Sequence, residues 1–467
     1  MMTEHTSVAW PHRLAVAGAL LVALGLIAGL AWTLSQRTAR PPNVLVIAID
    51  SLRRDRVGAY GSSRGLTPFL DELAARSTVY DHAYAPSSWT IPTVASLFTG
   101  RHPSEHQTAK FFVPLKESET TLAEALAAYG YATSAVTDNA AIRGDFGFGQ
   151  GFERYQLVGA PTVFNPKSDG GVVNAQTLRF VDEVGRERPH FIYLHYMDVH
   201  APYRPHEAFA PPRDPKLRRS DDTLNLALMS GSWEKHPERQ RSYWTFTTSE
   251  VFRLQDLYDS EVQHVDGRLR ELFDALGQRG FLDNALVVVT ADHGEEFGRH
   301  GAFYHGTTLY GAAINVPLIV QVPHQPPQRV TPPVELAGLG AMIADVVGMP
   351  RPPSFSVGWL SADPTRAQRA TAISELLETG QIKIWSHKRA LVGPAAKVIV
   401  TSDDQYLSYD LNSDPLERVP RPADDALRSA VDVRVSAMQA GSAGSEVELD
   451  EATRERLRAA GYLIEGP

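Results

Sequence analysis

Four polar residues, at three separate points of the sequence, have side chains that could together hold a metal ion. Asp50 follows one apolar run that reads as a buried strand, and the neighbours Asp292 and His293 follow another. Thr90 begins a segment that reads as a helix. In an open parallel sheet, ligands bind beyond the carboxyl ends of the strands, so these residues could converge there. Three oxygen donors and one nitrogen suit Mn²⁺, Mg²⁺, Ca²⁺ or Zn²⁺ and do not distinguish among them.

The segment around Thr90 indicates what such an ion could activate. It reads SSWTIPTVASLFTG from Ser87 to Gly100, with Thr90 at the expected helix N-cap and Pro92 in the first turn. Unpaired N–H groups and the positive dipole end at a helix start favour an anion, such as a phosphate or sulfate ester. A divalent ion would lower the pKa of the Thr90 hydroxyl and make it a nucleophile. Taken alone, the segment is more typical of a plain Thr cap.

The same segment resembles the nucleophile segment of the sulfatase family, in the alkaline phosphatase superfamily. That family shows Cys-x-Pro-Ser-Arg followed by Ala-Ser-Leu-Leu-Thr-Gly-Arg, and it oxidises the Cys, or a Ser, to formylglycine. Thr90 falls on the Cys position and Val94 on the Arg that supports formylglycine, and the chain contains no Cys. The resemblance therefore implies a variant in which Thr90 is a direct nucleophile. Phosphoethanolamine transferases and lipoteichoic-acid synthases, which transfer glycerol phosphate, keep Thr at this position.

Further motifs follow in the family's order and extend the resemblance over most of residues 43–322. Asp50, within IDSLRRDRVGAYG, matches the first metal-binding Asp of the family, and Asp292 and His293 match its second metal-binding pair. Ser51 stands where many sulfatases have another metal-binding Asp. The resemblance therefore implies one divalent ion, held by one acid, Thr, Asp and His.

Two His residues match positions that contact the ester in the family. His200 lies in the Asp-x-His-x-Pro-Tyr pattern, and His305 lies in HGTTLYG at a position of Lys or His. The resemblance implies that both bind the ester, and either could protonate the leaving oxygen because His titrates near neutral pH. His195 and His300 lie near these motifs, but packing and solvation are their more common roles.

The alternation of apolar runs and amphipathic segments predicts the elements that position these residues. It is typical of an α/β fold with a mostly parallel sheet sandwiched by helices, as in alkaline phosphatase and sulfatases. From about His387 the pattern changes to short strands and one helix, which predicts a small antiparallel α+β subdomain. We expect an anchor and linker over 1–40, a sulfatase-like catalytic domain over 41–386 and the C-terminal subdomain over 387–467.

Two other stretches have a more limited interpretation. The sequence Tyr409–Pro420 resembles the YDLxxDPxE stretch near the sulfatase C-terminus, and we expect it to act only as a turn and a helix start. Residues 206–249 interrupt the periodic pattern directly after the His200 motif. They could wall or cover a substrate pocket, and an ordinary surface excursion is an equally good interpretation.

The N-terminal stretch Leu14–Leu34 carries no charged residue and predicts a single membrane-spanning helix. It is longer than the apolar part of a typical cleavable signal peptide, although cleavage near Ala31 is the alternative. Arg residues flank it on both sides and do not decide its orientation. By analogy with the family, we expect the catalytic domain outside the cytoplasm, on the cell membrane.

The composition narrows the class of function. The chain has 467 residues, 43% of them hydrophobic and 21% charged, which is ordinary for a folded enzyme. A formal net charge of −9 argues against non-specific binding of nucleic acid. The absence of Cys excludes disulfides, thiolate zinc sites and thiol nucleophiles.

Together these observations predict a metal-dependent hydrolase or transferase that cleaves a phosphate ester, or less favourably a sulfate ester, through Thr90. The ester could belong to a lipid or a glycan. One alternative is a sulfuric-ester hydrolase, similar to arylsulfatases, that works without formylglycine. Another is a catalytically silent, membrane-tethered binding protein that keeps the fold.

Overall fold

The structure is a computed structural model that describes residues 40–110, 113–158, 169–206, 208–231, 246–355, 371–377 and 387–439. The chain divides into two compact units, Met1–Pro41 and Pro42–Pro467, and all the elements below belong to the second. The predicted membrane helix Leu14–Leu34 lies outside the described residues and stays a prediction. Within the described ranges, no helix combines the length and the apolar character needed to cross a bilayer.

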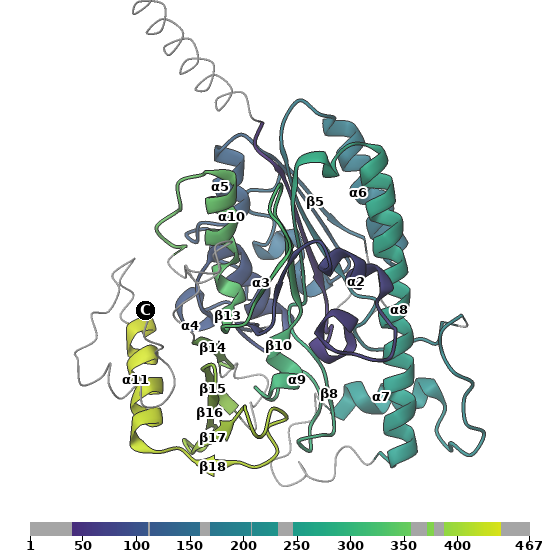
Figure 1. Ribbon diagram of the computed structural model, residues 1–467, viewed down its shortest axis with the longest axis vertical. Helices are drawn as coiled ribbons and strands as arrows, with labels where there is room; N and C mark the ends of the chain where they lie inside the picture. Colours follow the sequence, from purple (N-terminus) through teal and green to yellow (C-terminus); the bar gives the residue numbers. More distant parts are fainter. Residues whose placement is uncertain are drawn as a thin grey trace, which may run out of the picture. The chain divides into compact units, whose positions relative to one another are not determined.

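An eight-stranded sheet forms the centre of the second unit (Figure 1). In sheet order its strands are β12 (Gln328–Val330), β2 (Thr78–Tyr80), β11 (Leu318–Gln321), β7 (Ala285–Thr290), β1 (Asn43–Ile49), β6 (His190–Tyr196), β4 (Ala132–Thr137) and β5 (Arg154–Leu157). The strands from β7 to β5 run parallel, whereas β11 is antiparallel to both of its neighbours. The predicted α/β fold with a mostly parallel sheet is confirmed.

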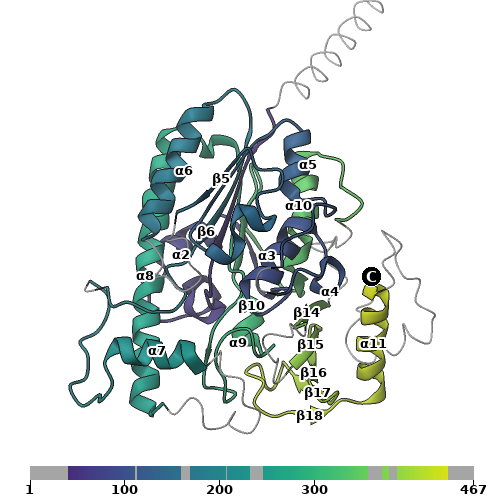
Figure 2. The same cartoon turned by 180° about the vertical axis from the view of Figure 1, so that it is seen from behind.

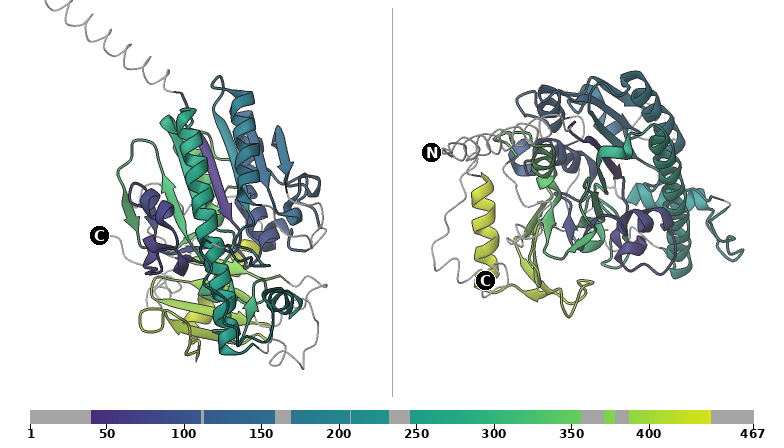
Figure 3. Two further views of the ribbon diagram at one scale, coloured as in Figure 1. Left: turned by 90° about the vertical axis from the view of Figure 1, so that its right-hand side faces the viewer. Right: turned by 45° about the horizontal axis from the view of Figure 1, so that its top comes forward.

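Helices cover both faces of this sheet, which explains why its central strands are continuous apolar runs. One face is covered by α2 (Pro68–Ala74), α6 (Gly170–Val184) and α8 (Thr248–Gln278), and the other by α3 (Thr90–Thr99), α5 (Leu122–Ala128) and α10 (Leu339–Val347) (Figures 1 and 2). Figure 3 shows α8 running along the length of the sheet. The shorter elements between them are α4 (Pro103–His106), α7 (Asp221–Gly231), α9 (Gly311–Ile314), β3 (Ala83–Tyr84), β8 (Glu296–Phe297), β9 (Phe303–Tyr304), β10 (Asn315–Val316) and β13 (Val334–Glu335).

Helix α3 brings Thr90 to the carboxyl end of the sheet. Its N-cap is Trp89, whose backbone is extended (φ −157°, ψ 164°). Thr90 is therefore the first helical residue and not the N-cap that the sequence predicts, because helical backbone angles begin one residue later. Gly100 ends the helix with a φ of 67°, the left-handed conformation that Gly adopts at helix ends.

A second, antiparallel sheet follows in the C-terminal part of the chain, as predicted. Its five strands are β14 (Ala372–Glu375), β15 (His387–Val392), β16 (Ala396–Thr401), β17 (Tyr406–Asp410) and β18 (Arg421–Pro422). One face packs against α11 (Asp425–Gln439), and the other packs against the segment around α9 (Figures 1 and 2). The first strand of this sheet precedes residue 387, where the sequence suggests the subdomain begins, and the domain boundaries themselves stay a prediction.

Candidate active site

Three predicted metal ligands meet at the carboxyl ends of β1 and β7. Asp50 directly follows β1, and Asp292 and His293 follow β7. One ligand atom from each of the three lies within 4.8 Å of the other two, and all three side chains are buried. Because β1 and β7 are parallel neighbours, their ends lie side by side at one edge of the sheet. The strand-end argument from the sequence therefore placed these residues where the structure has them.

Asp50 is the most heavily hydrogen-bonded member of the cluster. Its Oδ2 accepts hydrogen bonds from Asn139 Nδ2 at 2.9 Å and from His195 Nε2 at 3.1 Å. The hydroxyl of Thr90 lies 3.4 Å from the same oxygen, and Ser51 Oγ donates to Oδ1 at 2.8 Å. Four neighbouring side chains thereby hold the carboxylate of Asp50 in place.

Burial opposes ionisation of Asp50, but neighbouring His residues outweigh it. Electrostatic interactions with His200 and His293, together with the hydrogen bond from His195, hold the pKa of Asp50 well below its usual range. Asp292 behaves oppositely, because burial and the negative charge of Asp50 raise the pKa of Asp292 to about 8. Two carboxylates this close cannot both ionise without a compensating positive charge.

Asp292 also shows that the residues present fit a divalent cation. Its Oδ1 accepts hydrogen bonds from the backbone N–H groups of Ser51 at 3.2 Å and His293 at 2.9 Å. Its Oδ2 is buried and has no hydrogen-bond donor among the residues that the structure describes. A buried carboxylate oxygen without a donor, directed at a second carboxylate and an imidazole, is the arrangement that a dication would satisfy. Carboxylate and imidazole ligands together suit the ions predicted from the sequence.

His293 presents one ring nitrogen to this cluster. Its Nδ1 donates to the carbonyl oxygen of Gly294 at 2.8 Å, so the other nitrogen, Nε2, has a free lone pair. Nε2 lies 3.5 Å from Asp50 Oδ1 and 3.4 Å from Asp292 Oδ2. Gly294 is required here by close packing, because a Cβ at this position would lie 2.0 Å from the carbonyl oxygen of Ala312.

The Thr90 hydroxyl lies at the edge of the same cluster. Besides its 3.4 Å contact with Asp50, Oγ1 lies 3.4 Å from His293 Nε2 and 3.5 Å from Asn139 Nδ2. Only 6% of the residue is exposed. Val94, one turn later, is fully buried in the core. The structure therefore places the predicted nucleophile next to the predicted metal ligands.

His200 and His305 lie beside each other on the same side of the cluster. Their ring centroids are 5.0 Å apart, and the ring of His305 is 4.3 Å from that of His293. His305 Nδ1 donates to both carboxylate oxygens of Glu295 at 3.3 Å, and His200 Nε2 lies 3.2 Å from the hydroxyl of Tyr304. The two His predicted from the sequence are thus brought together with the metal ligands.

Burial disfavours the positively charged form of both of these imidazoles. It lowers the pKa of His200 to about 4, although the negative charge of Asp50 acts in the opposite direction. It also lowers the pKa of His305 well below its usual value, with a contribution from the charge of His293. A bound anionic ester would raise the pKa of both, because an opposite charge favours the imidazolium form.

Several residues in the site were not among the predicted site residues. Asn139 follows β4 and Glu295 follows the Asp292–His293 pair, so the strand-end argument could have found them. Tyr304 stacks on His305, with ring centroids 3.9 Å apart, and its φ of 66° is unusual for a residue with a side chain. The sequence contains no signal for this conformation. His195, for which the sequence favoured a packing role, also lies in the site, where it contacts Asp50.

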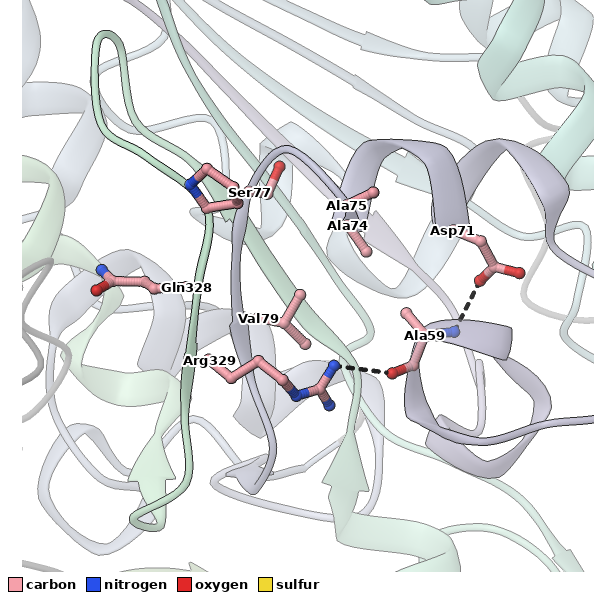
Figure 4. A pocket seen from close by; sticks show the side chains of 9 residues that line it. Ala59, Asp71, Ala74, Ala75, Ser77, Val79, Gln328 and Arg329 are labelled. Carbon is pink, nitrogen blue, oxygen red and sulfur yellow. Dashed lines mark hydrogen bonds between the residues drawn. The ribbon is translucent and has the colours of Figure 1, made fainter.

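His300 and a surface cavity lie outside this cluster. His300 contacts Glu296 and the carbonyl oxygen of Leu416 instead of the cluster. A cavity of about 380 Å³ lies beside α2 and β12, and none of the predicted site residues lines it (Figure 4). Polar groups in its lining already form hydrogen bonds with one another. Asp71 accepts from the backbone N–H of Ala59, and Arg329 donates to the carbonyl oxygen of Ala59.

Curated relatives of the chain include arylsulfatases. Arylsulfatase K of Bos taurus is 25% identical over 347 residues, which cover 68% of this chain and 64% of the relative. Arylsulfatase A of Homo sapiens is 28% identical over 312 residues, which cover 58% of this chain and 55% of the relative. The chain therefore spans less than two thirds of the length of these relatives.

Solved structures with the same fold include sulfatases and a phosphonate hydrolase. BT4656, solved in complex with its substrate D-glucosamine-2-N,6-O-disulfate, has a TM-score of 0.68 and 16% identity and covers 90% of this chain and 99% of its own. The phosphonate monoester hydrolase of Agrobacterium radiobacter has a TM-score of 0.65 and 18% identity, covering 85% and 95%. At these identities the likeness supports the fold alone.

A family model described as Sulfatase matches residues 42–349 of the chain. The match begins one residue before β1 and ends two residues after α10, so it contains the whole large sheet and every residue of the site described above. Since it also covers well over half of the sequence, this chain belongs to the sulfatase family.

Proposed function

We propose that this protein is a metal-dependent hydrolase or transferase that cleaves a phosphate ester, and less readily a sulfate ester, with Thr90 as nucleophile. One observation carries the proposal: the Thr90 hydroxyl lies 3.4 Å from both Asp50 and His293, at the position where the family has the residue that becomes formylglycine. Thr cannot become that aldehyde, and Val94 replaces the Arg that supports it. A direct attack by the hydroxyl is the chemistry that remains.

Asp50, Thr90, Asp292 and His293 would hold one divalent ion, which supplies a positive charge that lowers the pKa of a hydroxyl and offsets the charge of an ester. Asp50 and Asp292 balance the two charges of such an ion. A further acidic side chain, Glu295, pairs with His305, and the groups that lower the pKa of Asp50 are His side chains. This balance favours an ester with one negative charge, such as a phosphodiester, over a phosphate monoester with two.

The reaction then proceeds in two displacements. The Thr90 hydroxyl gives up its proton to solvent, and its oxygen forms a bond to phosphorus while the bond from phosphorus to the leaving oxygen breaks. His200 or His305, protonated once the anionic ester is bound, gives the leaving oxygen a proton. Water or an acceptor alcohol next attacks the Thr90 phosphoester. The attacking molecule gives its proton to the same His, which is thereby restored. The bond between phosphorus and the Thr90 oxygen breaks, and Thr90 takes its proton back from solvent.

Trapping the covalent ester tests this proposal. Protein quenched during turnover of a phosphodiester is expected to carry the added phosphoryl group on the peptide that contains Thr90, detected by mass spectrometry. Thr90→Ala is expected to lose the adduct and at least ~10³-fold in kcat, because the nucleophile is gone. Thr99→Ala, which removes a buried hydroxyl at the other end of the same helix, is the matched control and should keep full activity.

Sulfate monoesters and phosphate mono- and diesters, assayed side by side, separate the alternatives. The arylsulfatase relatives and the substrate named for BT4656 favour a sulfuric-ester hydrolase as the second candidate. A faster turnover of sulfate esters would establish that candidate. Protein that binds no divalent ion and cleaves none of these esters would instead be a silent binding protein.

The location is part of the proposal and is supported by the sequence. The uncharged stretch Leu14–Leu34 is long enough to cross a bilayer, and we place the catalytic domain outside the cytoplasm by analogy with the family. Such a location gives access to lipid or glycan esters at the cell surface.

A further inference from the structure

The segment that carries His305 is held in place partly by the C-terminal sheet. It runs from β9 to α9 and reads HGTTLYG from His305 to Gly311. At its start, the N–H of Gly306 donates to the carbonyl oxygen of Ser88 at 2.9 Å. At its end, the N–H of Gly311 donates to Glu417 Oε2 at 2.7 Å. Glu417 belongs to the YDLNSDPLE stretch that follows β17, more than a hundred residues later.

Glu417 is itself held in an unusual way. Its Oε1 accepts from Lys397 Nζ at 2.6 Å, and Lys397 is fully buried in β16. Its backbone has a φ of 55°, in the left-handed region that residues with a side chain rarely adopt. A buried ion pair and a strained backbone are each unfavourable or neutral for stability. Their combination at one residue indicates that its position matters for more than the stability of the sheet.

The same stretch reaches the His305 segment at two further points, one of them indirectly through His300. The carbonyl oxygen of Leu416 lies 2.9 Å from His300 Nε2, and the ring of His300 stacks on Tyr310 at 3.6 Å between centroids. Tyr310 also meets Tyr409 of β17, with 3.4 Å between their hydroxyl oxygens. Behind these contacts, Leu309, Ala313 and Ile314 share an apolar cluster with the face of the C-terminal sheet.

We propose that Glu417 is a positioning residue, which fixes the backbone at Gly311 and thereby holds His305 at the ester-binding position. The inference rests on the proposed function, because it gives His305 its role there. It extends the active-site architecture beyond residue 349, into a sheet that the family-model match does not include. It also gives the YDLNSDPLE stretch a role beyond the turn and helix start expected from its sequence.

Two double variants test the contact without leaving a buried charge unpaired. Lys397→Met with Glu417→Leu replaces the ion pair by apolar side chains of similar size, which proteins commonly tolerate, and removes the acceptor for Gly311. Lys397→Met with Glu417→Gln also removes both charges but keeps a side-chain carbonyl oxygen for Gly311. We expect kcat/KM for the phosphodiester to fall about 10- to 100-fold in the first variant and to recover in the second.

A cycle with His305→Ala distinguishes positioning from a general structural effect. If Glu417 acts through His305, the Leu and Gln double variants should differ less than about twofold in the His305→Ala background. Asp404→Leu is the matched control, because Asp404 also has a positive φ and also pairs with a Lys on the same sheet. It should leave kcat/KM unchanged.

A second pair of variants changes Gly311 and leaves both residues of the ion pair, Lys397 and Glu417, unchanged. Gly311 is the first residue of α9 and Tyr310 before it is extended (φ −70°, ψ 159°), so Pro is compatible with the backbone at this position. Gly311→Pro removes the N–H donor, whereas Gly311→Ala keeps it and places a Cβ at 3.6 Å from Glu417, an ordinary contact. Activity should fall in the Pro variant alone. This pair decides the question if the Leu variant does not fold.

The imidazole resonances of His305, measured by NMR, provide a readout that does not need turnover. We expect them to shift in the Glu417→Leu and Gly311→Pro variants and to stay in place in the Gln and Ala variants. Unchanged resonances and unchanged kcat/KM in folded Leu and Pro variants would overturn the inference and leave the proposed function intact. Shifted resonances in a protein that cleaves no ester would uphold the positioning contact and reject the proposed function.

Discussion

At the scale of single residues, the site is defined by a conflict between two carboxylates. Asp50 is surrounded by donors that favour its charge, whereas burial and the charge of Asp50 hold the pKa of Asp292 at about 8. The protein keeps this arrangement although it is unfavourable without a cation. Such local conflict is expected where function, and not stability, selects the residues.

Metal binding should therefore stabilise the protein strongly and depend on Asp292. An ion at 100 times its Kd is expected to add about 2.7 kcal/mol to the free energy of unfolding, and chelation should remove this gain. Asp292→Asn keeps the acceptor oxygen for Ser51 and His293 but removes the repulsion, so its metal-free form should be at least as stable as the metal-free native protein. Denaturant unfolding with and without ion measures both. An equal gain in the Asn variant would show that the ion binds elsewhere.

At the scale of elements, helix α3 must be held so that Thr90 stays at the metal cluster. Its Ser96 hydroxyl lies 3.0 Å from His106 Nε2, at the end of α4, and the N–H of Thr108 donates to His106 Nδ1 at 3.0 Å. His106 is fully buried. Burial, followed by the nearby positive charges of His102 and Arg101, lowers its pKa to about 3. A neutral imidazole thus ties the two helices together.

This contact should make the protein less stable in acid. The pKa of His106 is about 3 in the folded state and about 6.5 in the unfolded state, so the unfolded state binds the proton more readily below pH 6.5. The contribution of neutral His106 to the free energy of unfolding is fully present above pH 6.5. It decreases by about 1.4 kcal/mol per pH unit as the pH falls from 6.5 towards 3. His106→Gln, which does not titrate, should have a shallower dependence in denaturant unfolding between pH 6 and 4. Parallel curves for the two proteins would contradict this expectation.

At the scale of the whole molecule, the site depends on parts of the chain that lie far apart in the sequence. The large sheet supplies the proposed metal ligands, α3 supplies Thr90, and the C-terminal sheet contacts the segment of His305 through Glu417. The N-terminal stretch adds the proposed connection to the membrane.

Removing Leu14–Leu34 tests that connection. The full chain should sediment with membranes and resist extraction by salt and alkali, because a long uncharged stretch is stabilised in the hydrocarbon core. The shortened chain should stay in the supernatant and keep its activity on a water-soluble ester. Protease added to intact cells should reach the catalytic domain of the full chain. A full chain that washes off with salt would be bound at the surface and not anchored.

The sequence was most informative where a residue type and its position after a strand carried the argument together. Asp50, Asp292 and His293 could be placed because parallel neighbouring strands bring their carboxyl ends to one edge. Asn139 obeys the same rule and was missed only because an amide after a strand is commonly a turn former. Tyr304 and Glu417 could not have been found, because positive φ angles and contacts between distant loops leave no pattern in the sequence.

The amino-acid sequence by itself determined the α/β fold, through local periodicity, and the residues that could bind a metal, through their types and their positions after strands. Its motifs carried the resemblance to the family, and with it the replacement of Cys by Thr90. Only the tertiary structure shows that Glu295 pairs with His305 and that His195 and Asn139 donate hydrogen bonds to Asp50. Only the tertiary structure shows that Glu417 accepts a hydrogen bond from Gly311, at the end of the His305 segment. These contacts depend on side-chain directions in loops and on packing between separate sheets. Long-range packing is settled by the whole fold, and no short stretch of the chain encodes it.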